Sequence, residues 1–338
     1  MKITVNDIAR VAKVSQTTVS RVLNNYPQIK ESTRKRVLDA IDELKFTPDS
    51  VARSMVTNKT NTLGLIVGDI SNPFFAESAK IIIGKAQKLN YDVIVSNTNH
   101  EDGNLDHSIR TLMSKRVDGI LISSVNRTST IIKDLYGLNF PIVLFNSRVE
   151  DESSNYIVLD NKKGAMLAVD HLVDLGHKKI AFINGLPKYL TLFDRYVGYK
   201  AALKKRGIDY RQDYVYDGAF SYDKVYEFVI ELLSRDDRPT SFFATSDQMA
   251  LAVMDGAASK NIRIPEELSI VGFDNMSISS NRYIGLTTIS QQKEEMSLTA
   301  LEKLLLLINK RESVTLPIQI TLEPELIVRN TTGLVPKG

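Results

Sequence analysis

Residues 4–24 of the 338-residue chain read TVNDIARVAKVSQTTVSRVLN, and this stretch decides the fold of the N-terminal part. Its apolar residues recur at helical spacing in two sets, Val5, Ile8, Ala9 and Ala12, then Val19, Val22 and Leu23. Between the sets, residues 13–15 predict a tight turn with Ser15 as the N-cap of the second helix. Two short amphipathic helices joined in this way are typical of a helix-turn-helix.

The outward face of the second predicted helix carries side chains that can read bases: Gln16, Thr17, Ser20, Arg21 and Asn24. Gln can pair with adenine, Arg with guanine, and Thr can offer its methyl group to thymine. A third helix, capped by Ser32, is predicted to bury Val37, Leu38, Ile41 and Leu44 and to bring Arg34, Lys35 and Arg36 near phosphates. A small helical bundle with a polar face is the alternative at this point.

Charge separates this head from the rest of the chain. The first 60 residues hold eleven Lys and Arg against six Asp and Glu, whereas the remaining residues hold 32 against 34. A basic head on a nearly neutral body points to a polyanionic partner, although a solvated surface would have the same composition. The length favours two or three packed units of ordinary globular composition.

Several classes of protein are excluded by what the sequence lacks. The chain has no cysteine, which rules out disulfides and thiolate chemistry. No signal-peptide pattern or stretch of transmembrane length occurs, so we expect a cytoplasmic, nucleoid-associated protein without membrane contact. Because no phosphate-binding loop, nucleophile elbow or zinc-protease motif is found, we expect no enzyme, cofactor or metal. Of the four histidines, we expect a structural role for His177 and surface positions for His100, His107 and His171.

From residue 62 onward, short apolar runs alternate with helical patterns. The runs at 63–67, 91–95, 119–122 and 142–145 predict buried strands, and a second set follows at 180–183, 241–244 and 269–273. Such βαβ alternation indicates parallel sheets with helices on both faces. We therefore expect two doubly wound α/β subdomains with a ligand cleft at the carboxyl ends of their strands.

The head resembles the lactose-repressor (LacI/GalR) family of bacterial regulators at nearly every position of the pattern D-I/V-A-x-x-A-x-V-S-x-x-T-V-S-R-V-x-N. The resemblance implies that Gln16, Thr17 and Arg21 read bases. It also implies a supporting, phosphate-contacting role for Thr4, Ser15, Thr18 and Asn24.

Residues 46–56, FTPDSVARSMV, resemble the family's hinge helix, in which paired hinges enter the minor groove of the operator. The resemblance places Ser50, Val51, Ala52, Arg53 and Met55 in this role. Met55 stands where the family usually has Leu, and Asp49 where it usually has Asn. So short a helix is marginal alone in water, and a plain linker is the alternative.

The body resembles the sugar-binding periplasmic-protein fold through SNPFF at 71–75, RYVGY at 195–199, SDQMA at 246–250 and GFD at 272–274. By this resemblance, the effector-binding residues are Asn72, Phe74, Phe75, Asn146, Arg148, Arg195, Phe220, Ser246, Asp274 and Gln291. Aromatic faces suit the C–H surfaces of a sugar, and polar groups suit its hydroxyls. Three arginines, Arg148, Arg195 and Arg282, favour a sugar acid or sugar phosphate.

The predicted organisation is a helix-turn-helix domain at 1–47, a hinge helix and linker at 48–61, an effector and dimerisation domain at 62–330, and a tail at 331–338. The N-subdomain spans about 62–160 and 291–322, and the C-subdomain about 161–290 and 323–330. The resemblance to the family implies that the chain crosses between them near Asp160, Gln291 and Glu323. Leu304 to Leu307 are predicted to be helix core and not a zipper.

The expected function is repression of carbohydrate-use genes by a homodimer. It would bind a pseudo-palindromic operator in double-stranded DNA, under allosteric control by a sugar, sugar acid or sugar phosphate. Two other interpretations remain open. One is a solute receptor without regulation, which the head disfavours, and the other is a regulator that senses a phosphoprotein, as one branch of the family does.

Overall fold

The computed structural model describes residues 3–23, 26–46, 59–309 and 316–336. The chain divides into two compact units, Met1–Thr60 and Asn61–Gly338. Six predicted DNA-contacting residues lie outside the described residues: Asn24 and the hinge residues Ser50, Val51, Ala52, Arg53 and Met55.

The described residues of the first unit form three helices, α1 (Val5–Ala12), α2 (Gln16–Leu23) and α3 (Glu31–Glu43). The turn between α1 and α2 is tight because Lys13 takes a left-handed φ of 53°. The Ser15 hydroxyl accepts a hydrogen bond from the Thr18 backbone N–H at 3.2 Å, which confirms Ser15 as the cap of α2. The apolar stripes of the three helices meet in one small core, formed by Ile8, Ala9, Ala12, Val19, Val22, Val37 and Ala40.

Two predictions for α3 are wrong. The helix begins at Glu31 with Lys30 at its N-cap, so Ser32 lies inside the first turn. Leu38 is 47% exposed, whereas Val37 and Ala40 are buried. Positions 37, 40, 41 and 44 share one face at a period of 3.6 residues, and position 38 points about 100° away from position 37.

The second unit contains two six-stranded sheets. The first joins β1 (Thr62–Val67), β2 (Asp92–Asn97), β3 (Gly119–Ile122), β4 (Ile142–Phe145), β5 (Tyr156–Leu159) and β11 (Gln319–Leu322), all parallel, in the order β11-β5-β4-β3-β1-β2. The second joins β6 (Ile180–Ile183), β7 (Val215–Tyr216), β8 (Ser241–Ala244), β9 (Ser269–Asp274), β10 (Thr287–Ser290) and β12 (Glu325–Ile327), in the order β12-β10-β9-β8-β6-β7. Only the pairing of β12 with β10 is antiparallel among the paired strands of the described residues.

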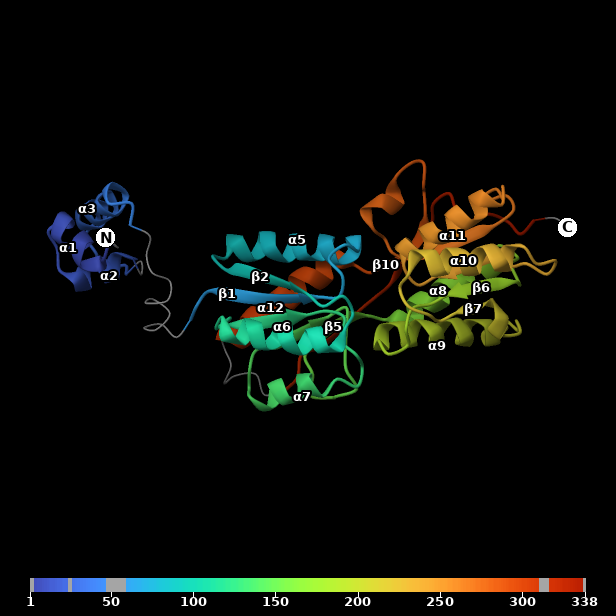
Figure 1. The fold of residues 1–338 in the computed structure, drawn as a ribbon, viewed down its shortest axis with the longest axis horizontal. Coiled ribbons are helices and arrows are strands. Elements are labelled where there is room, and N and C mark those ends of the chain that lie inside the picture. Colours follow the sequence, from blue (N-terminus) through green and yellow to red (C-terminus); the bar gives the residue numbers. More distant parts are fainter. Residues whose placement is uncertain (1–2, 24–25, 47–58, 310–315, 337–338) are drawn as a thin grey trace. The chain divides into compact units, whose positions relative to one another are not determined.

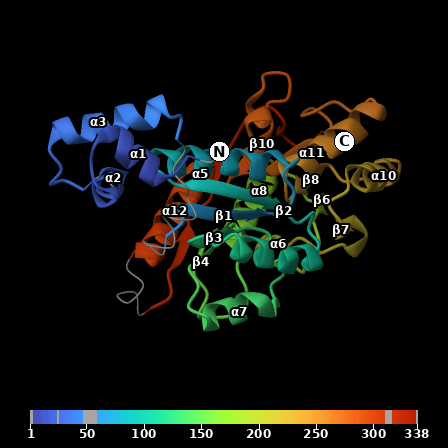
Figure 2. The same cartoon turned by 60° about the vertical axis from the view of Figure 1, so that its left-hand side comes forward.

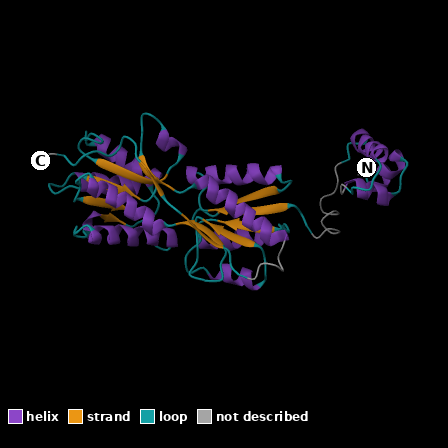
Figure 3. Ribbon diagram, turned by 180° about the vertical axis from the view of Figure 1, so that it is seen from behind, coloured by secondary structure: helices purple, strands orange, loops and turns teal. Residues whose placement is uncertain are grey.

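Helices cover both faces of each sheet (Figures 1 and 2). On the first sheet, α5 (Pro73–Lys88) packs with α12 (Lys293–Asn309) on one face, and α6 (Asp102–Ser114) and α7 (Thr130–Gly137) cover the other. On the second sheet, α8 (Asn161–Asp174) pairs with α9 (Leu190–Lys205), and α10 (Tyr222–Leu233) pairs with α11 (Asp247–Ser259). Figure 3 shows the strands enclosed between helices in both halves, which confirms the predicted α/β fold class.

The chain passes between the two sheets three times, at Asp160 after β5, at Gln291 after β10 and at Glu323 after β11. The first sheet with its helices is called the N-subdomain below, and the second the C-subdomain. Leu304 of α12 is fully buried in the core of the N-subdomain, as predicted for helix core.

Strand β2 was predicted to be buried, and this is wrong. It lies at the edge of the first sheet, and among the described strands it pairs only with β1. Ile94 and Val95 are consequently 38% and 39% exposed. An apolar run alone cannot distinguish a central strand from an edge strand, because burial depends on the neighbours that the strand finds.

His177 is fully buried, and its ring ties the end of the chain to the second sheet. Its Nδ1 lies 2.9 Å from the Thr240 hydroxyl, and its Nε2 lies 2.9 Å from the Ser269 hydroxyl and 3.1 Å from the Gly333 carbonyl oxygen. The predicted structural role is therefore confirmed. His107 is exposed as predicted, and His171 is half-buried, with its ring against the Thr332 hydroxyl.

Candidate functional site

A pocket of about 540 Å³, open to solvent, lies between the two subdomains. Each side chain that lines it comes from the end of a strand or from the segment that follows one, because parallel strands bring their carboxyl ends to one edge of a sheet. Nine of the ten predicted effector residues line the pocket: Asn72, Phe74, Phe75, Asn146, Arg195, Phe220, Ser246, Asp274 and Gln291.

Arg148 was predicted to line the pocket and does not. Its guanidinium extends to Asp194 of α9, with Nη2 at 2.8 Å from the carboxylate oxygen, so it bridges the two subdomains at the rim. Arg282 also lies away from the pocket and is exposed. Of the three arginines that favoured an anionic effector, only Arg195 reaches the pocket.

Seven further lining residues were missed in the sequence: His100, Ser124, Ser147, Tyr189, Thr191, Leu192 and Thr245. A usable signal existed for three of them. Ser124, Ser147 and Thr245 are small polar residues that come directly or almost directly after predicted strands. Tyr189, Thr191 and Leu192 lie at the start of α9, where only the three-dimensional path of the chain brings them to the pocket.

His100 lines the pocket, so its predicted surface position is wrong. It takes a left-handed φ of 61°, which turns the ring inward after β2. The ring stacks on Phe220 at 5.7 Å between centroids and lies 5.7 Å from Tyr189, both in the C-subdomain. Its Nδ1 is 2.8 Å from the Ser124 hydroxyl. Burial lowers the pKa of His100, which favours the neutral ring at neutral pH.

Arg195 lines the pocket and is only 3% exposed. Its Nε donates to the Asn161 amide oxygen at 2.8 Å, and Nη1 donates to the Thr245 carbonyl oxygen at 2.6 Å. The guanidinium carbon also lies 3.7 Å from the centre of the Phe273 ring. Burial lowers the pKa of Arg195 to about 10, so the group keeps its positive charge at neutral pH.

Asp274 ends β9 and is the acid of the pocket. Burial raises its pKa to about 7, against the opposing effect of the nearby Arg195 charge. Its carboxylate accepts a hydrogen bond from the Gln291 amide nitrogen. Its φ of 121° is a sparsely populated value for a residue with a side chain, and such conformations persist only where the surroundings hold them.

Three buried polar atoms of the lining have no hydrogen-bond partner among the described residues: the Asn146 and Gln291 amide oxygens and the Thr245 hydroxyl. Buried polar groups are normally paired, and an unpaired one costs free energy comparable to a lost hydrogen bond. The pocket therefore offers acceptors to a molecule that can donate hydrogen bonds.

The second candidate site is the exposed face of α2 in the first unit. Gln16, Thr17 and Arg21, predicted to read bases, are all exposed on this helix. The Ser15 and Thr18 hydroxyls lie 2.9 Å apart at its N-terminus, and the Thr4 hydroxyl donates to Asp7 at 2.8 Å at the start of α1.

No group of three or more His, Asp and Glu side chains in the described part of the chain lies close enough to hold a metal ion. Likewise, none of the described helices is both long and apolar enough to cross a membrane.

Comparison with known proteins finds matches to both parts of the chain. Residues 4–49 match the sequence profile of bacterial regulatory proteins of the lacI family, and residues 169–332 match that of the periplasmic binding protein-like domain. Catabolite control protein A of Priestia megaterium is 37% identical over 311 residues, which cover 92% of this chain and 94% of that protein. The chain belongs to the lacI family of bacterial regulatory proteins.

Other members agree over almost the whole length. The PurR repressor of Actinobacillus pleuropneumoniae is 34% identical, covering 97% of this chain and 98% of its own. A lac repressor dimer bound to operator and the anti-inducer ONPF superposes with a TM-score of 0.87 at 26% identity, covering 98% and 100%. A complex of the regulator CelR with cellobiose superposes with a TM-score of 0.73 at 27% identity, covering 97% and 99%.

This lacI-family protein is thus a DNA-binding transcriptional regulator whose activity an effector modulates, and not an enzyme.

The raised pKa of Asp274 predicts that the substitution Asp274→Asn stabilises the protein in alkaline solution. The unfolded carboxyl loses its proton near its ordinary pKa, whereas the folded one holds it up to about pH 7, so stability is lost as the pH rises through this range. We expect the variant to gain about 1–3 kcal/mol over the wild type near pH 8.5 and clearly less near pH 5. Urea unfolding at both pH values measures this, and a pH-independent difference would contradict it.

Proposed function

We propose that the chain is a homodimeric repressor of carbohydrate-use genes whose operator affinity is set by an uncharged sugar in the pocket between the subdomains. Residues 1–47 would read the operator, 48–61 would couple the two units, and 62–330 would bind the effector and dimerise, followed by a tail at 331–338. The observation that carries the proposal is an acceptor-rich pocket walled by aromatic rings, in a chain that also carries a helix-turn-helix head.

The base-reading role rests on the chemistry of the exposed face of α2. Gln16 and Arg21 can each make two hydrogen bonds to a purine edge in the major groove, and Thr17 can contact a thymine methyl. Ser15, Thr18 and Thr4 stand at helix N-termini, where backbone N–H groups favour a phosphate. Asn24 and the hinge residues keep the roles that the family pattern gives them.

The preference for a neutral sugar rests on two properties of the pocket: the hydrogen-bond acceptors that it offers, and the little unopposed positive charge that it holds. Two unpaired amide oxygens and the Asp274 carboxylate are acceptors, and they suit a ligand that is rich in hydroxyl donors. The charge of Arg195 is opposed by Asp274, while Arg148 is already paired with Asp194. An anionic ligand would therefore find one partly neutralised cation, which disfavours a sugar acid or sugar phosphate.

Phe75 and Phe220 supply flat apolar faces. The CelR–cellobiose complex gives independent support.

Homodimer formation is favoured by exposed apolar side chains in both subdomains. Ile94 and Val95 lie on the edge strand β2, and Tyr283 of the C-subdomain is 99% exposed. An uncovered apolar edge strand is a liability that proteins normally hide. A dimer would also bring two heads to the two half-sites of a pseudo-palindrome, as one head reads only one.

Effector and operator are then coupled through the dimer. An effector that binds more tightly to one relative pose of the subdomains shifts the protein to that pose, and so changes the distance between the two hinges. Coupling of this kind is reciprocal, so operator binding changes the affinity for the effector by the same factor. We place the protein in the cytoplasm with the nucleoid, where its operator would be found.

Arg21→Ala should weaken binding to an operator selected from random DNA duplexes by about 1–3 kcal/mol, because a bidentate contact to guanine is lost. We expect base preference to relax at one position of each half-site. Lys35→Ala is the matched control: it should weaken all sequences about equally and reduce the salt dependence. Equal loss on every sequence with Arg21→Ala would mean that Arg21 contacts phosphate.

The effector proposal is tested with D-glucose, D-galactose, D-ribose and cellobiose against D-gluconate and D-glucose 6-phosphate. We expect a neutral sugar to change the affinity for the selected operator by about 5–150-fold, and the two anions to leave it unchanged. Sugar affinity should rise with pH through about 7, because the ionised Asp274 is the better acceptor, and Asp274→Asn should flatten this profile. A response to the anions alone would reverse the proposed ligand class.

Ile94→Asp should convert the dimer into a monomer, because a carboxylate on the edge strand cannot be buried at low cost. Sedimentation measures the mass, and operator affinity should fall together with it. Leu138→Asp is the control, since Leu138 is 67% exposed after α7 and belongs to no proposed interface. A variant that remains dimeric would place the interface elsewhere.

A further inference from the structure

The segment from Asp274 to Ser277 carries the acid of the pocket on a constrained backbone. Asp274 and Asn275 both have positive φ, at 121° and 51°. Within the C-subdomain, the buried Asp247 carboxylate accepts from the Met276 backbone N–H at 2.8 Å. Arg329 donates to the Asn275 amide oxygen at 2.6 Å. This side of the segment is therefore anchored to its own subdomain.

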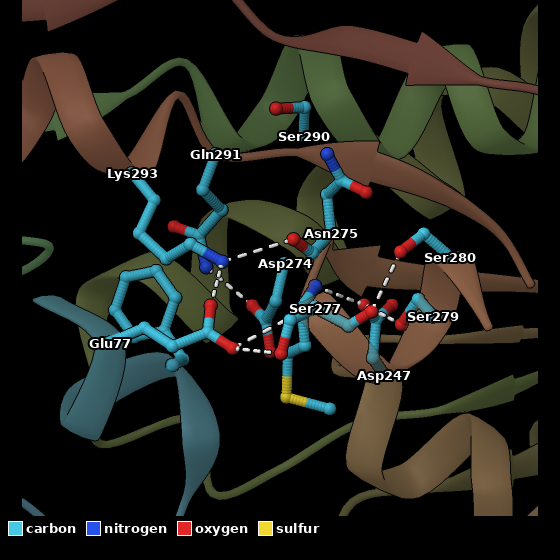
Figure 4. Close-up of polar contacts among 12 residues, drawn as sticks. Glu77, Asp247, Asp274, Asn275, Ser277, Ser279, Ser280, Ser290, Gln291 and Lys293 are labelled. Atoms are coloured by element: carbon cyan, nitrogen blue, oxygen red, sulfur yellow. Dashed lines mark hydrogen bonds and ion pairs between the residues drawn. The ribbon is translucent and has the colours of Figure 1, made fainter.

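The other side of the same segment is held by the N-subdomain (Figure 4). The Glu77 carboxylate of α5 accepts from the Ser277 backbone N–H at 3.1 Å and from the Ser277 hydroxyl at 2.6 Å. Lys293, at the start of α12, pairs with Glu77 and donates to the Asn275 carbonyl oxygen at 3.0 Å. Three hydrogen bonds thus cross from the N-subdomain to residues 275–277, and we call Glu77, Lys293 and Ser277 the rim clamp.

The rim clamp is shielded enough from water to matter energetically. The side chains of Glu77 and Lys293 are only 25% and 16% exposed, unlike those of an ordinary surface ion pair. Partial burial raises the pKa of Glu77, but the bonds from Lys293 and Ser277 outweigh it and hold the pKa below its ordinary value. Glu77 is thus a carboxylate at neutral pH, and hydrogen bonds to such a charged group are stronger than neutral ones.

Glu77 and Lys293 touch the segment that holds the pocket acid but do not line the pocket themselves. Glu77 lies less than one turn of α5 beyond Phe74 and Phe75, which do line it. Helix α5 therefore carries both the aromatic residues that the N-subdomain contributes to the pocket wall and the Glu77 carboxylate, which binds Ser277 of the opposite subdomain. Separating the subdomains must break the rim clamp and free one side of the Asp274 segment.

We infer that Glu77 is a positioning residue, which with Lys293 and Ser277 holds the cleft closed and fixes Asp274 in its effector-binding position. The inference rests on the proposed function only in taking Asp274 as an effector contact. By this inference, the rim clamp sets the free-energy difference between the open and the closed cleft. That difference determines how easily an effector shifts the protein from one state to the other.

The chain has no cysteine, so two introduced ones give unique spin-label sites. Lys133→Cys on α7 and Lys260→Cys after α11 place one exposed label on each subdomain. Distances between the labels are measured by pulsed electron spin resonance without sugar, with labelled protein diluted into unlabelled chain. We expect the wild-type background to show mainly the short distance, which corresponds to the closed cleft. In Glu77→Ala the open population should be about ten times larger, as for the loss of a hydrogen bond to a charged group. Ser277→Ala should act in the same direction.

Glu267→Ala is the matched control. Glu267 also accepts a hydrogen bond from a backbone N–H, that of Arg263, and its carboxylate pairs with the Arg263 guanidinium at 2.8 Å. Both residues belong to the C-subdomain, so this pair does not cross the cleft. Glu267→Ala should leave the distances unchanged. Glu77→Gln, which keeps an acceptor for Ser277, should open the cleft less than Glu77→Ala. The ¹³C carboxyl signal of Asp274, identified by its loss in Asp274→Asn, should titrate nearer its ordinary range in Glu77→Ala.

Two results would overturn the inference. One is a distance distribution in Glu77→Ala that coincides with the wild type, and the other is a wild type that already sits at the long distance. If Glu77→Ala opens the cleft but no tested sugar binds, the role inferred for the rim clamp still stands. That result would count only against the proposed effector.

Discussion

Parallel strands bring their carboxyl ends to a single edge of the sheet, and the functional chemistry of the larger unit depends on this constraint. The two sheets contribute such edges to one cleft, so the residues that follow their strands become its walls. Polar groups gathered there away from water must find partners, as Arg195 does with Asn161 and the Thr245 carbonyl group. The atoms that remain unpaired define what a ligand must bring.

The spacing of apolar residues was enough to predict much of this architecture. The helix-turn-helix follows from two short 3.6-residue periods, and seven strands follow from short apolar runs. Strands β11 and β12 could not be predicted in this way, because they are half-exposed and each completes a sheet with partners distant in sequence. Similarly, the exposure of Ile94 follows from the position of β2 at an edge, which no local pattern encodes.

Backbone conformation explains why some pocket residues escaped notice. His100, Ser124, Asn146 and Asp274 all line the pocket with positive φ. Asn and Asp tolerate this region better than most residues, so their presence after strands was a readable sign. Histidine shares this tolerance, but its presence in a loop does not show where the ring points. Only the folded path of the chain shows that the His100 ring turns inward against Phe220.

The rim clamp stands beside the pocket and not within it, and this separation has an evolutionary consequence. A change in the lining residues can alter which molecule binds while the free energy between open and closed cleft stays nearly constant. Conversely, a change at Glu77 or Lys293 can reset the concentration at which a regulator responds without altering what it recognises. Ligand preference and response threshold are then independent traits, open to separate selection in one scaffold.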